Sequence, residues 1–478
     1  MGLMAILALT LLAALLCSLI RQYAWAITGV STWGCLALAV YIAAEVVRHS
    51  RVVGIPGWFE ADGLSALMLL LVSFVLALAA VFARGYMQHG HANDRLWWFY
   101  ANYNLLCFAL LAVPCLAEPN LTWVAVELVT LFSVLLVGFD RTSNALEAAW
   151  KFAMLTIMGA PIALLGFFTL FWAFRMATGL RWETWDGLRL AAASLNPNLL
   201  KFSFLLVFVG FGAKSGLAPM HMWLPDAHSQ APTPVCAVLS GVKTTVPLYV
   251  ILRLLSIVLA SPTARVGSWM IVLGLVSVAV AAFLLVQVRD YKRMFAYSTV
   301  EHMGIILTAA GMATAASDFG AVSQILNHAI TKSLCFYVAG VLLLVLSTRE
   351  IPSIRGLLRI SPFAGGALFL CSLAIAGAPP FPIFLSEFSI LSAGVHAGHK
   401  VVVGLLAALI VIAFVAIMSH VNGMLLGKPE SSMTAGILPA SCRFTVWVAA
   451  LPVVVLGVYM PAPVHTLLQL AAQQLGGH

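Results

Sequence analysis

Charged residues are scarce in this sequence. Only 9% of its 478 residues are Asp, Glu, Lys or Arg, whereas 62% are hydrophobic. Soluble globular domains carry roughly 25% charged residues, so the scarcity excludes a soluble globular protein. A membrane-spanning helix needs about 20 mostly apolar residues, and the chain has room for about 14 of them. We therefore predict an all-α polytopic membrane protein in which residues 1–478 form a single membrane domain.

Metal-binding and redox motifs are also missing. None of the cysteines forms a C-x-x-C pair, and most of them lie in apolar runs, where small buried side chains are expected. The pair His89 and His91 supplies two ligands, too few for a metal site. We expect no metal and no cofactor in this chain. The eight cysteines are Cys17, Cys35, Cys107, Cys115, Cys236, Cys335, Cys371 and Cys442.

No basic run with interleaved aromatic residues accompanies the formal net charge of +8, so we expect no nucleic-acid partner. The first 20 residues are apolar but lack a basic leading segment and a cleavage site, and they are expected to form the first span rather than a cleaved signal. The loops that follow odd-numbered spans contain more lysines and arginines than the loops that follow even-numbered spans. The positive-inside rule then predicts a multi-pass protein of the cell inner (plasma) membrane with both termini on the periplasmic side.

Apolar runs separated by charged or Gly/Pro-rich segments predict the individual helices. The expected spans are 2–20, 26–47, 64–85, 99–117, 120–139, 150–174, 200–219, 232–260, 267–287, 292–313, 320–346, 362–394, 401–426 and 443–462.

Two of these spans are interrupted. Span 7 runs into Gly216-Leu-Ala-Pro219, and span 12 runs into Gly377-Ala-Pro379-Pro380. Proline removes a backbone donor and breaks a helix, and broken helices at matching positions are typical of transporters with inverted repeats. Because the breaks are five spans apart, we predict two inverted five-helix repeats, spans 4–8 and 9–13. The corresponding segments are N-terminal spans at 1–118, a first half-channel at 119–260, a second at 261–426 and a C-terminal span at 427–478.

Ionisable residues lie inside the predicted spans, where each costs about 2.5–3.5 kcal/mol on insertion scales. In the first half they are Glu127 in span 5, Lys214 beside the break of span 7, and Lys243 near the start of span 8. A buried lysine near a glutamate can act as a switch for loading and releasing protons. The alternatives are a structural ion pair for Glu127 and lysines that extend their ammonium groups to the membrane edge.

The second half carries five more such residues. His328 and Lys332 are four residues apart, which places both on one helix face. Glu301 and His302 are adjacent, so they point in different directions. Glu387 follows the break of span 12 and is the expected counterpart of Lys214. A row of protonatable groups is what a proton path through a membrane requires, although a structural role for any single one of them stays open.

Several of these segments resemble the antiporter-like subunits of respiratory complex I and its relatives. The resemblance covers about 120–390. It is carried by Lys214-Ser-Gly-Leu-Ala-Pro-Met-His-Met-Trp-Leu-Pro-Asp-Ala-His, by Ala296-Tyr-Ser-Thr-Val-Glu-His-Met-Gly and by Asn327-His-Ala-Ile-Thr-Lys-Ser-Leu. It implies that Glu127 modulates a channel, that Lys214 pairs with it, and that His328 and Lys332 connect the two halves. It also implies that Glu387 occupies the position of the terminal Lys or Glu that the family carries in span 12.

In many relatives a lysine stands at the position of Thr245, whereas this chain has Lys243 two residues earlier. That departure puts the middle of the path in question. The Val-Glu-His-Met-Gly sequence with Glu301 and the Met-Trp-Leu-Pro-Asp-Ala-His run are most similar to hydrogenase-4 component F, an antiporter-like subunit of membrane-bound [NiFe]-hydrogenase and formate hydrogenlyase complexes.

The resemblance therefore implies a non-catalytic, proton-translocating subunit of a redox-driven complex. Its expected partners are other antiporter-like and complex I-like membrane subunits and a peripheral arm that holds the redox cofactors. The alternatives are a subunit of a multi-subunit cation/proton antiporter, the membrane subunit of an inorganic-carbon uptake complex, and a scaffold that keeps the fold without conducting.

Overall fold

The computed structural model describes residues 1–89, 95–180, 183–428 and 436–476. His91 lies outside these residues. The helices of the first half are α1 (Gly2–Leu19), η1 (Arg21–Tyr23), α2 (Ala24–His49), α3 (Gly63–Gln88), α4 (Leu96–Cys115), α5 (Pro119–Val137), α6 (Ser143–Thr178), α7 (Trp185–Ala191), α8 (Pro197–Ser215), η3 (Met220–Met222), α9 (Trp223–Gln230), α10 (Thr233–Val238), the π-helical turn η4 (Leu239–Lys243) and α11 (Thr245–Ala260).

The second half continues with α12 (Gly267–Gln287), α13 (Tyr291–Gly311), α14 (Ala315–Leu346), η5 (Ile351–Ser353), α15 (Leu357–Ile360), α16 (Pro362–Ile375), α17 (Pro382–His396), α18 (Lys400–Leu425), α19 (Ala440–Val458) and α20 (Ala462–Gly476). A hairpin of β1 (Val52–Ile55) and β2 (Phe59–Ala61) joins α2 to α3. Helices suit a membrane because they satisfy their own backbone hydrogen bonds.

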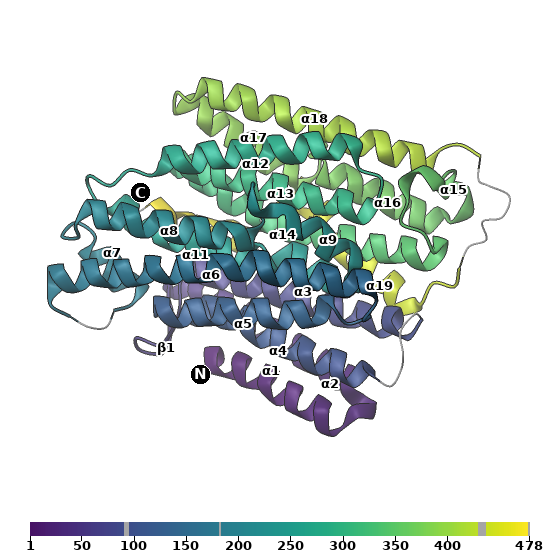
Figure 1. The fold of residues 1–478 in the computed structure, drawn as a ribbon, viewed down its shortest axis with the longest axis horizontal. Coiled ribbons are helices and arrows are strands. Elements are labelled where there is room, and N and C mark those ends of the chain that lie inside the picture. Colours follow the sequence, from purple (N-terminus) through teal and green to yellow (C-terminus); the bar gives the residue numbers. More distant parts are fainter. Residues whose placement is uncertain (90–94, 181–182, 429–435, 477–478) are drawn as a thin grey trace.

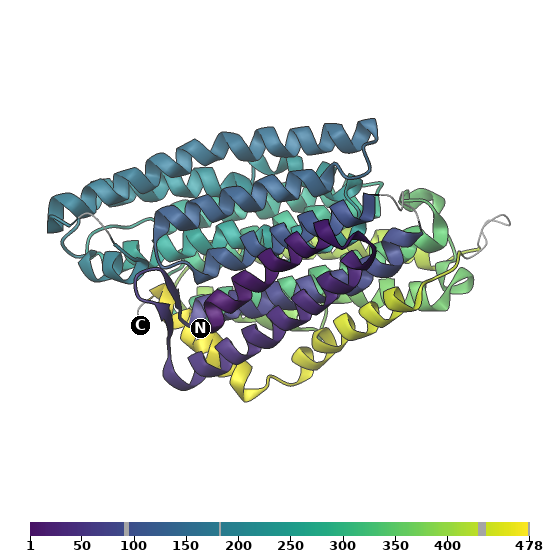
Figure 2. The ribbon, with the colours of Figure 1, turned by 90° about the horizontal axis from the view of Figure 1, so that it is seen from below.

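The long helices lie roughly parallel, with α1 and α2 at one edge of the bundle and α17 and α18 at the other (Figure 1). Both termini lie at the same end of the helices, which we call the termini face. Helix α14 occupies the centre, where it packs against α3, α10, α13, α16, α17, α19 and α20. Figure 2 shows the C-terminal segment beside the N-terminal helices, in keeping with the packing of α19 and α20 on α3.

Twelve helices in the described part of the chain are long and apolar enough to cross a membrane. They correspond to twelve of the predicted spans, so the all-helical, multi-pass architecture is confirmed. The predicted span 292–313 is α13, which is long enough but less apolar because it carries several charged residues. The predicted span 362–394 is divided into the shorter helices α16 and α17. The count of 14 and the five-helix repeats stay predictions.

Both helix breaks occur where the sequence predicts them. Helix α8 ends at Gly216, which has a φ of +77°, and α16 is followed by Gly377 with the same φ. This left-handed conformation carries no steric cost for glycine and is a common way to end a helix. Pro219 and the pair Pro379 and Pro380 lie in the connections that follow. Gly216 is buried and Gly377 is partly buried, whereas the three prolines are exposed.

Two features had no sequence prediction. Helix α20 follows the last predicted span and packs its buried leucines against α3, α11 and α14. The β-hairpin lies on the termini face, and its strands of four and three residues are too short to stand out from a loop in the sequence.

Candidate functional site: a buried polar axis

The first group of buried charges is built on three helices. Lys214, fully buried one residue before the end of α8, donates hydrogen bonds to Glu127 Oε2 on α5 (3.0 Å), whose side chain is 22% exposed, and to Thr130 Oγ1 (2.8 Å). The other oxygen of Glu127 has no hydrogen-bond partner among the described residues. The pairing expected from the sequence is thus present, and Thr130 is a partner that the sequence analysis missed. It lies one turn after Glu127 on the same helix face, which is the signal that could have identified it.

Lys243 is also buried but has no carboxylate partner within ion-pair distance in the described part of the chain. Its ammonium lies 3.9 Å from the ring centroid of Trp223 and 4.5 Å from that of Phe152, and it donates a hydrogen bond to the backbone carbonyl of Lys214 (3.2 Å). Aromatic faces attract cations most strongly when water is excluded. The two rings, which stack on each other at 4.5 Å, therefore take the place of a counter-ion.

The π-helical turn η4 connects the two halves. Because the amide of Thr244 donates to Leu239 instead of to Ser240, the carbonyl of Ser240 is released from the regular helical pattern. It accepts hydrogen bonds from the hydroxyl of Thr244 (3.1 Å) and from His328 Nε2 on α14 (3.2 Å). Thr245 stands at the position where relatives were expected to carry a lysine. Its hydroxyl donates a hydrogen bond to the backbone carbonyl of Gly241 (3.3 Å).

The second group begins at His328, whose ring centroid is 5.3 Å from that of His302 on α13. Gln324 donates to His302 Nδ1 (2.9 Å), while His302 Nε2 donates to the carbonyl of Ile375 at the end of α16 (3.2 Å). Glu387 Oε1 lies 3.8 Å from His302 Nδ1. The axis therefore continues from the central α14 to the break of the second half.

Glu387 is 5% exposed, on the first turns of α17. Its carboxylate lies against Gly377, where a β-carbon would be only 2.5 Å from Oε2. Lys214 and Glu387 thus both lie at a helix break, as predicted, although Lys214 precedes its break and Glu387 follows its own.

The side chain of Lys332 contacts other residues than that of His328. It donates hydrogen bonds to the Phe295 carbonyl (2.7 Å) and to the Ser298 hydroxyl, both on α13. Glu301, also on α13 and buried, interacts electrostatically with Lys332. The printed contacts link Glu127, Lys214 and Lys243 to one another, and His328, His302 and Glu387 to one another, while Lys332 and Glu301 lie on the same two helices as the histidines. We call these eight predicted residues the polar axis. Its members are Glu127, Lys214, Lys243, Glu301, His302, His328, Lys332 and Glu387.

A further buried acid, Asp318, went unnoticed in the sequence analysis. It lies in the first turns of α14 and is 1% exposed, and neither of its carboxylate oxygens has a hydrogen-bond partner among the described residues. Its position near an end of a predicted span made it look like an ordinary loop charge.

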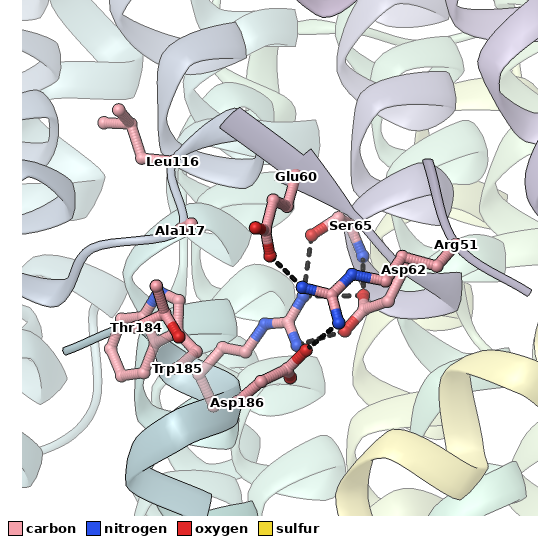
Figure 3. A pocket seen from close by; sticks show the side chains of 10 residues that line it. Arg51, Glu60, Asp62, Ser65, Leu116, Ala117, Thr184, Trp185 and Asp186 are labelled. Carbon is pink, nitrogen blue, oxygen red and sulfur yellow. Dashed lines mark hydrogen bonds and ion pairs between the residues drawn. The ribbon is translucent and has the colours of Figure 1, made fainter. Parts of the chain in front are cut away.

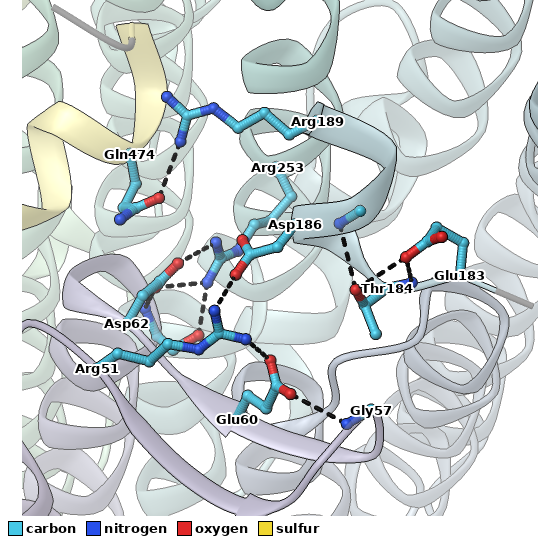
Figure 4. A network of polar contacts seen from close by, with 12 residues as sticks. Arg51, Gly57, Glu60, Asp62, Glu183, Thr184, Asp186, Arg189, Arg253 and Gln474 are labelled. Carbon is cyan, nitrogen blue, oxygen red and sulfur yellow. Dashed lines mark hydrogen bonds and ion pairs between the residues drawn. The ribbon is translucent and has the colours of Figure 1, made fainter. Parts of the chain in front are cut away.

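A second cluster lies on the termini face, which we call the termini-face network: Arg51, Glu60, Asp62, Asp186 and Arg253. It surrounds a cavity of about 20 Å³, large enough for a single water molecule (Figure 3). Arg253 on α11 pairs with Asp62, and Arg51 joins Glu60 to Asp186 (Figure 4). The network ties the hairpin and the start of α3 to α7 and α11.

No group of three His, Cys, Asp or Glu side chains that could hold a metal occurs in the part of the chain that the structure describes.

Comparison with known proteins gives a consistent result. Residues 120–413 match the family model described as NADH:quinone oxidoreductase/Mrp antiporter, TM, and residues 53–100 match that of the N-terminus of NADH-ubiquinone oxidoreductase (complex I) chain 5. The chain is 36% identical over 418 residues to a hydrogenase-4 component F homolog of Methylacidiphilum infernorum (isolate V4), covering 85% of this chain and 86% of the relative.

Solved structures with the same fold include a chain of the membrane-bound sulfane sulfur reductase, an archaeal respiratory membrane complex, with a TM-score of 0.87 and 22% identity. A chain of the Mrp complex from Dietzia sp. DQ12-45-1b has a TM-score of 0.88 and 18% identity. Each covers 99% of this chain and 97% of the other. The chain is a multi-pass integral membrane protein, and it belongs to the NADH:quinone oxidoreductase/Mrp antiporter family.

Proposed function

We propose that this chain is a proton-translocating subunit of a redox-driven membrane complex related to complex I, of the membrane-bound hydrogenase or formate hydrogenlyase type. The observation that carries the proposal is the polar axis. Charged and titratable groups in the membrane are expensive and rarely retained without a role in transport. Here they line up from Glu127 through the centre of the bundle to Glu387, connected by contacts of side chains and released carbonyls.

The chemistry of the axis suits protons. Histidine can accept and donate a proton near neutral pH. The Nε2 atoms of His302 and His328 each donate a hydrogen bond to a backbone carbonyl. The Nδ1 atom of His328 has no partner among the described residues, so a proton acceptor is available in the middle of the axis. In this proposal Lys214 and Glu127 exchange a proton in the first half, the histidines carry it across, and Glu387 receives it.

The type of complex is inferred from the hydrogenase-4 component F homolog, which is 36% identical. We propose that the partners are other antiporter-like and complex I-like membrane subunits, that the redox cofactors reside in a peripheral arm of partner subunits, and that the chain resides in the plasma membrane with both termini outside. The shared fold with a chain of an Mrp complex favours one second candidate, a subunit of a cation/proton antiporter.

Purification in a gentle detergent, followed by mass spectrometry of the co-purifying chains, tests the type of complex. A [NiFe]-type large subunit and ferredoxin-like proteins are expected. Recovery of small antiporter subunits alone would contradict a redox-driven complex and favour the second candidate.

Two substitutions in the second half test the axis itself. Lys332→Ala and Glu387→Gln should each lower proton flux in reconstituted vesicles, because each removes a group that can carry charge along the axis. The control is Glu350→Gln, which makes the same substitution as Glu387→Gln but at an exposed loop residue. It should leave proton flux unchanged. If both axis variants match the wild type, the chain acts as a scaffold instead.

The aromatic rings around Lys243 give a prediction of their own. Trp223→Leu removes the closer ring face, and a desolvated cation–π contact is worth about 2 kcal/mol. We expect lower flux in this variant, and we expect Lys243→Met with Trp223→Leu to be no worse than Lys243→Met alone, since coupled residues are not additive. Trp172→Leu on the exposed face of α6 is the control. Strictly additive losses would show that Trp223 acts independently of Lys243.

A further inference from the structure

At the end of the bundle opposite the termini, a pocket opens between the starts of α2 and α4 and the end of α3. Its lining includes Arg21, Trp25, Trp97 and Tyr100, and its volume is about 470 Å³. That size falls in the range of small-molecule sites. None of these residues belongs to the polar axis or to the termini-face network.

Two arginines are stacked on two tryptophans at this pocket. The guanidinium of Arg21 lies 4.3 Å from the ring centroid of Trp97, and that of Arg84, on the last turns of α3, lies 4.0 Å from the ring centroid of Trp25. Both arginines are exposed. The contact with an aromatic ring restrains each guanidinium, and a guanidinium presents several N–H donors that suit bidentate binding of a phosphate.

The pocket has an excess of donors and of positive charge. In the described part of the chain no carboxylate pairs with Arg21 or Arg84, and the one side-chain hydrogen bond of Arg21 goes to the Ser18 carbonyl (3.4 Å). Tyr100 is 3% exposed and lines the pocket. A ligand that fits here carries negative charge and accepts several hydrogen bonds.

The position of the pocket indicates the source of such a ligand. Trp25 and Trp97 are the second residues of α2 and α4, and both helices are candidate membrane spans. Tryptophan and tyrosine at helix ends mark the level of the lipid headgroups, and basic pockets between membrane helices at that level bind anionic headgroups. We propose that the pocket lined by Arg21, Trp25, Trp97 and Tyr100, together with Arg84 on the ring of Trp25, binds the phosphate headgroup of an anionic phospholipid.

The test uses the full chain, purified together with the subunits that accompany it and stripped of lipid. Phosphatidylglycerol is added back, and bound lipid is measured by native mass spectrometry. The probe variant is Arg21→Gln with Arg84→Gln. Each basic residue contributes about 1 kcal/mol to binding at an anionic membrane surface, so the double change should weaken binding about 30-fold.

The matched control is Arg355→Gln with Arg443→Gln. These arginines are also exposed, each donates to a backbone carbonyl, and neither stacks on an aromatic ring among the described residues. The control removes the same charge, so it should bind phosphatidylglycerol as the wild type does. Zwitterionic phosphatidylcholine and inorganic phosphate serve as further probes, and both should bind poorly.

Three results would overturn the proposal. Equal loss in the probe and control variants would show a general charge effect, and equal retention of phosphatidylcholine would show that headgroup charge is not recognised. Inorganic phosphate binding as tightly as the lipid would show a site for the free anion. The proposal does not depend on proton transport, because lipid retention is measured without any flux.

Discussion

Replacing Lys214 by methionine should abolish proton translocation in reconstituted vesicles. Lys214 is fully buried and holds Glu127 and Thr130, so methionine removes the only lysine that reaches that carboxylate within the described residues. Losing one partner of a buried pair leaves an uncompensated charge at a cost of about 3–5 kcal/mol, and assembly must therefore be checked beside flux.

Lys214→Arg separates a structural role from a proton-carrying one. Arginine keeps the positive charge and the pairing with Glu127, but it does not release its proton in proteins. We expect this variant to assemble normally and still fail to conduct. Lys201→Met, a partly exposed lysine on the same helix, is the control. Wild-type flux in both Lys214 variants would refute the assigned role, and flux restored by arginine alone would make Lys214 structural.

Asp62→Asn should lower the melting temperature of the protein. The decrease should be larger than for any other single Asp→Asn or Glu→Gln substitution on the termini face. Asp62 caps α3 by accepting a hydrogen bond from the Ser65 amide (3.0 Å) and pairs with the buried Arg253. Asparagine is as good an N-cap as aspartate, so the substitution removes the charge and keeps the cap. The expected cost is again about 3–5 kcal/mol.

The second variant needed is Asp62→Asn combined with Arg253→Gln, which leaves no unpaired charge and should regain part of the loss. Thermal unfolding in detergent measures both. A double variant less stable than Asp62→Asn would contradict the view that the isolated guanidinium is the source of the damage.

The same pair predicts a dependence on acid. Burial by itself raises the pKa of Asp62, but Arg253 together with the backbone amides of Ser65 and Leu64 more than offsets this, so the pKa of the carboxyl lies below its ordinary value of 3.8. A carboxyl whose pKa is lowered by folding contributes stability that is complete above its ordinary pKa and disappears as the pH falls through the lowered one. The wild type should therefore lose this contribution only below about pH 4, and Asp62→Asn should show no such loss.

The sequence predicted the long apolar helices, both breaks and the charged members of the polar axis, since these depend on local composition and on the cost of burying charge. The pairing of Lys214 with Glu127 is present as expected. The tertiary contacts were not predictable. His328 and Lys332 are one helical turn apart, yet the side chain of His328 reaches the carbonyl of Ser240 and that of Lys332 contacts α13.

The π-helical turn at η4 had no sequence signal either. It depends on packing, since a β-carbon on Gly241 would lie 3.2 Å from the carbonyl of Ala329 on α14. From the sequence, the displaced lysine put the middle of the path in question, whereas in the structure the ammonium of Lys243 lies against two stacked aromatic rings and contacts the Lys214 carbonyl. The rings come from α6 and α9, and periodicity gives no information on such distant partners.

The composition of the polar axis has one more consequence. Its first half contains Lys214 and Lys243 against Glu127, and its second half contains Glu301 and Glu387 against Lys332. With these lysines and glutamates ionised and the two histidines neutral, the first half has a single excess positive charge and the second half a single excess negative charge, which is a dipole lying in the plane of the membrane. Moving one proton from the lysine-rich half to the glutamate-rich half cancels both excesses at once. Proton transfer along the axis therefore neutralises the dipole, and reprotonation of the lysines restores it.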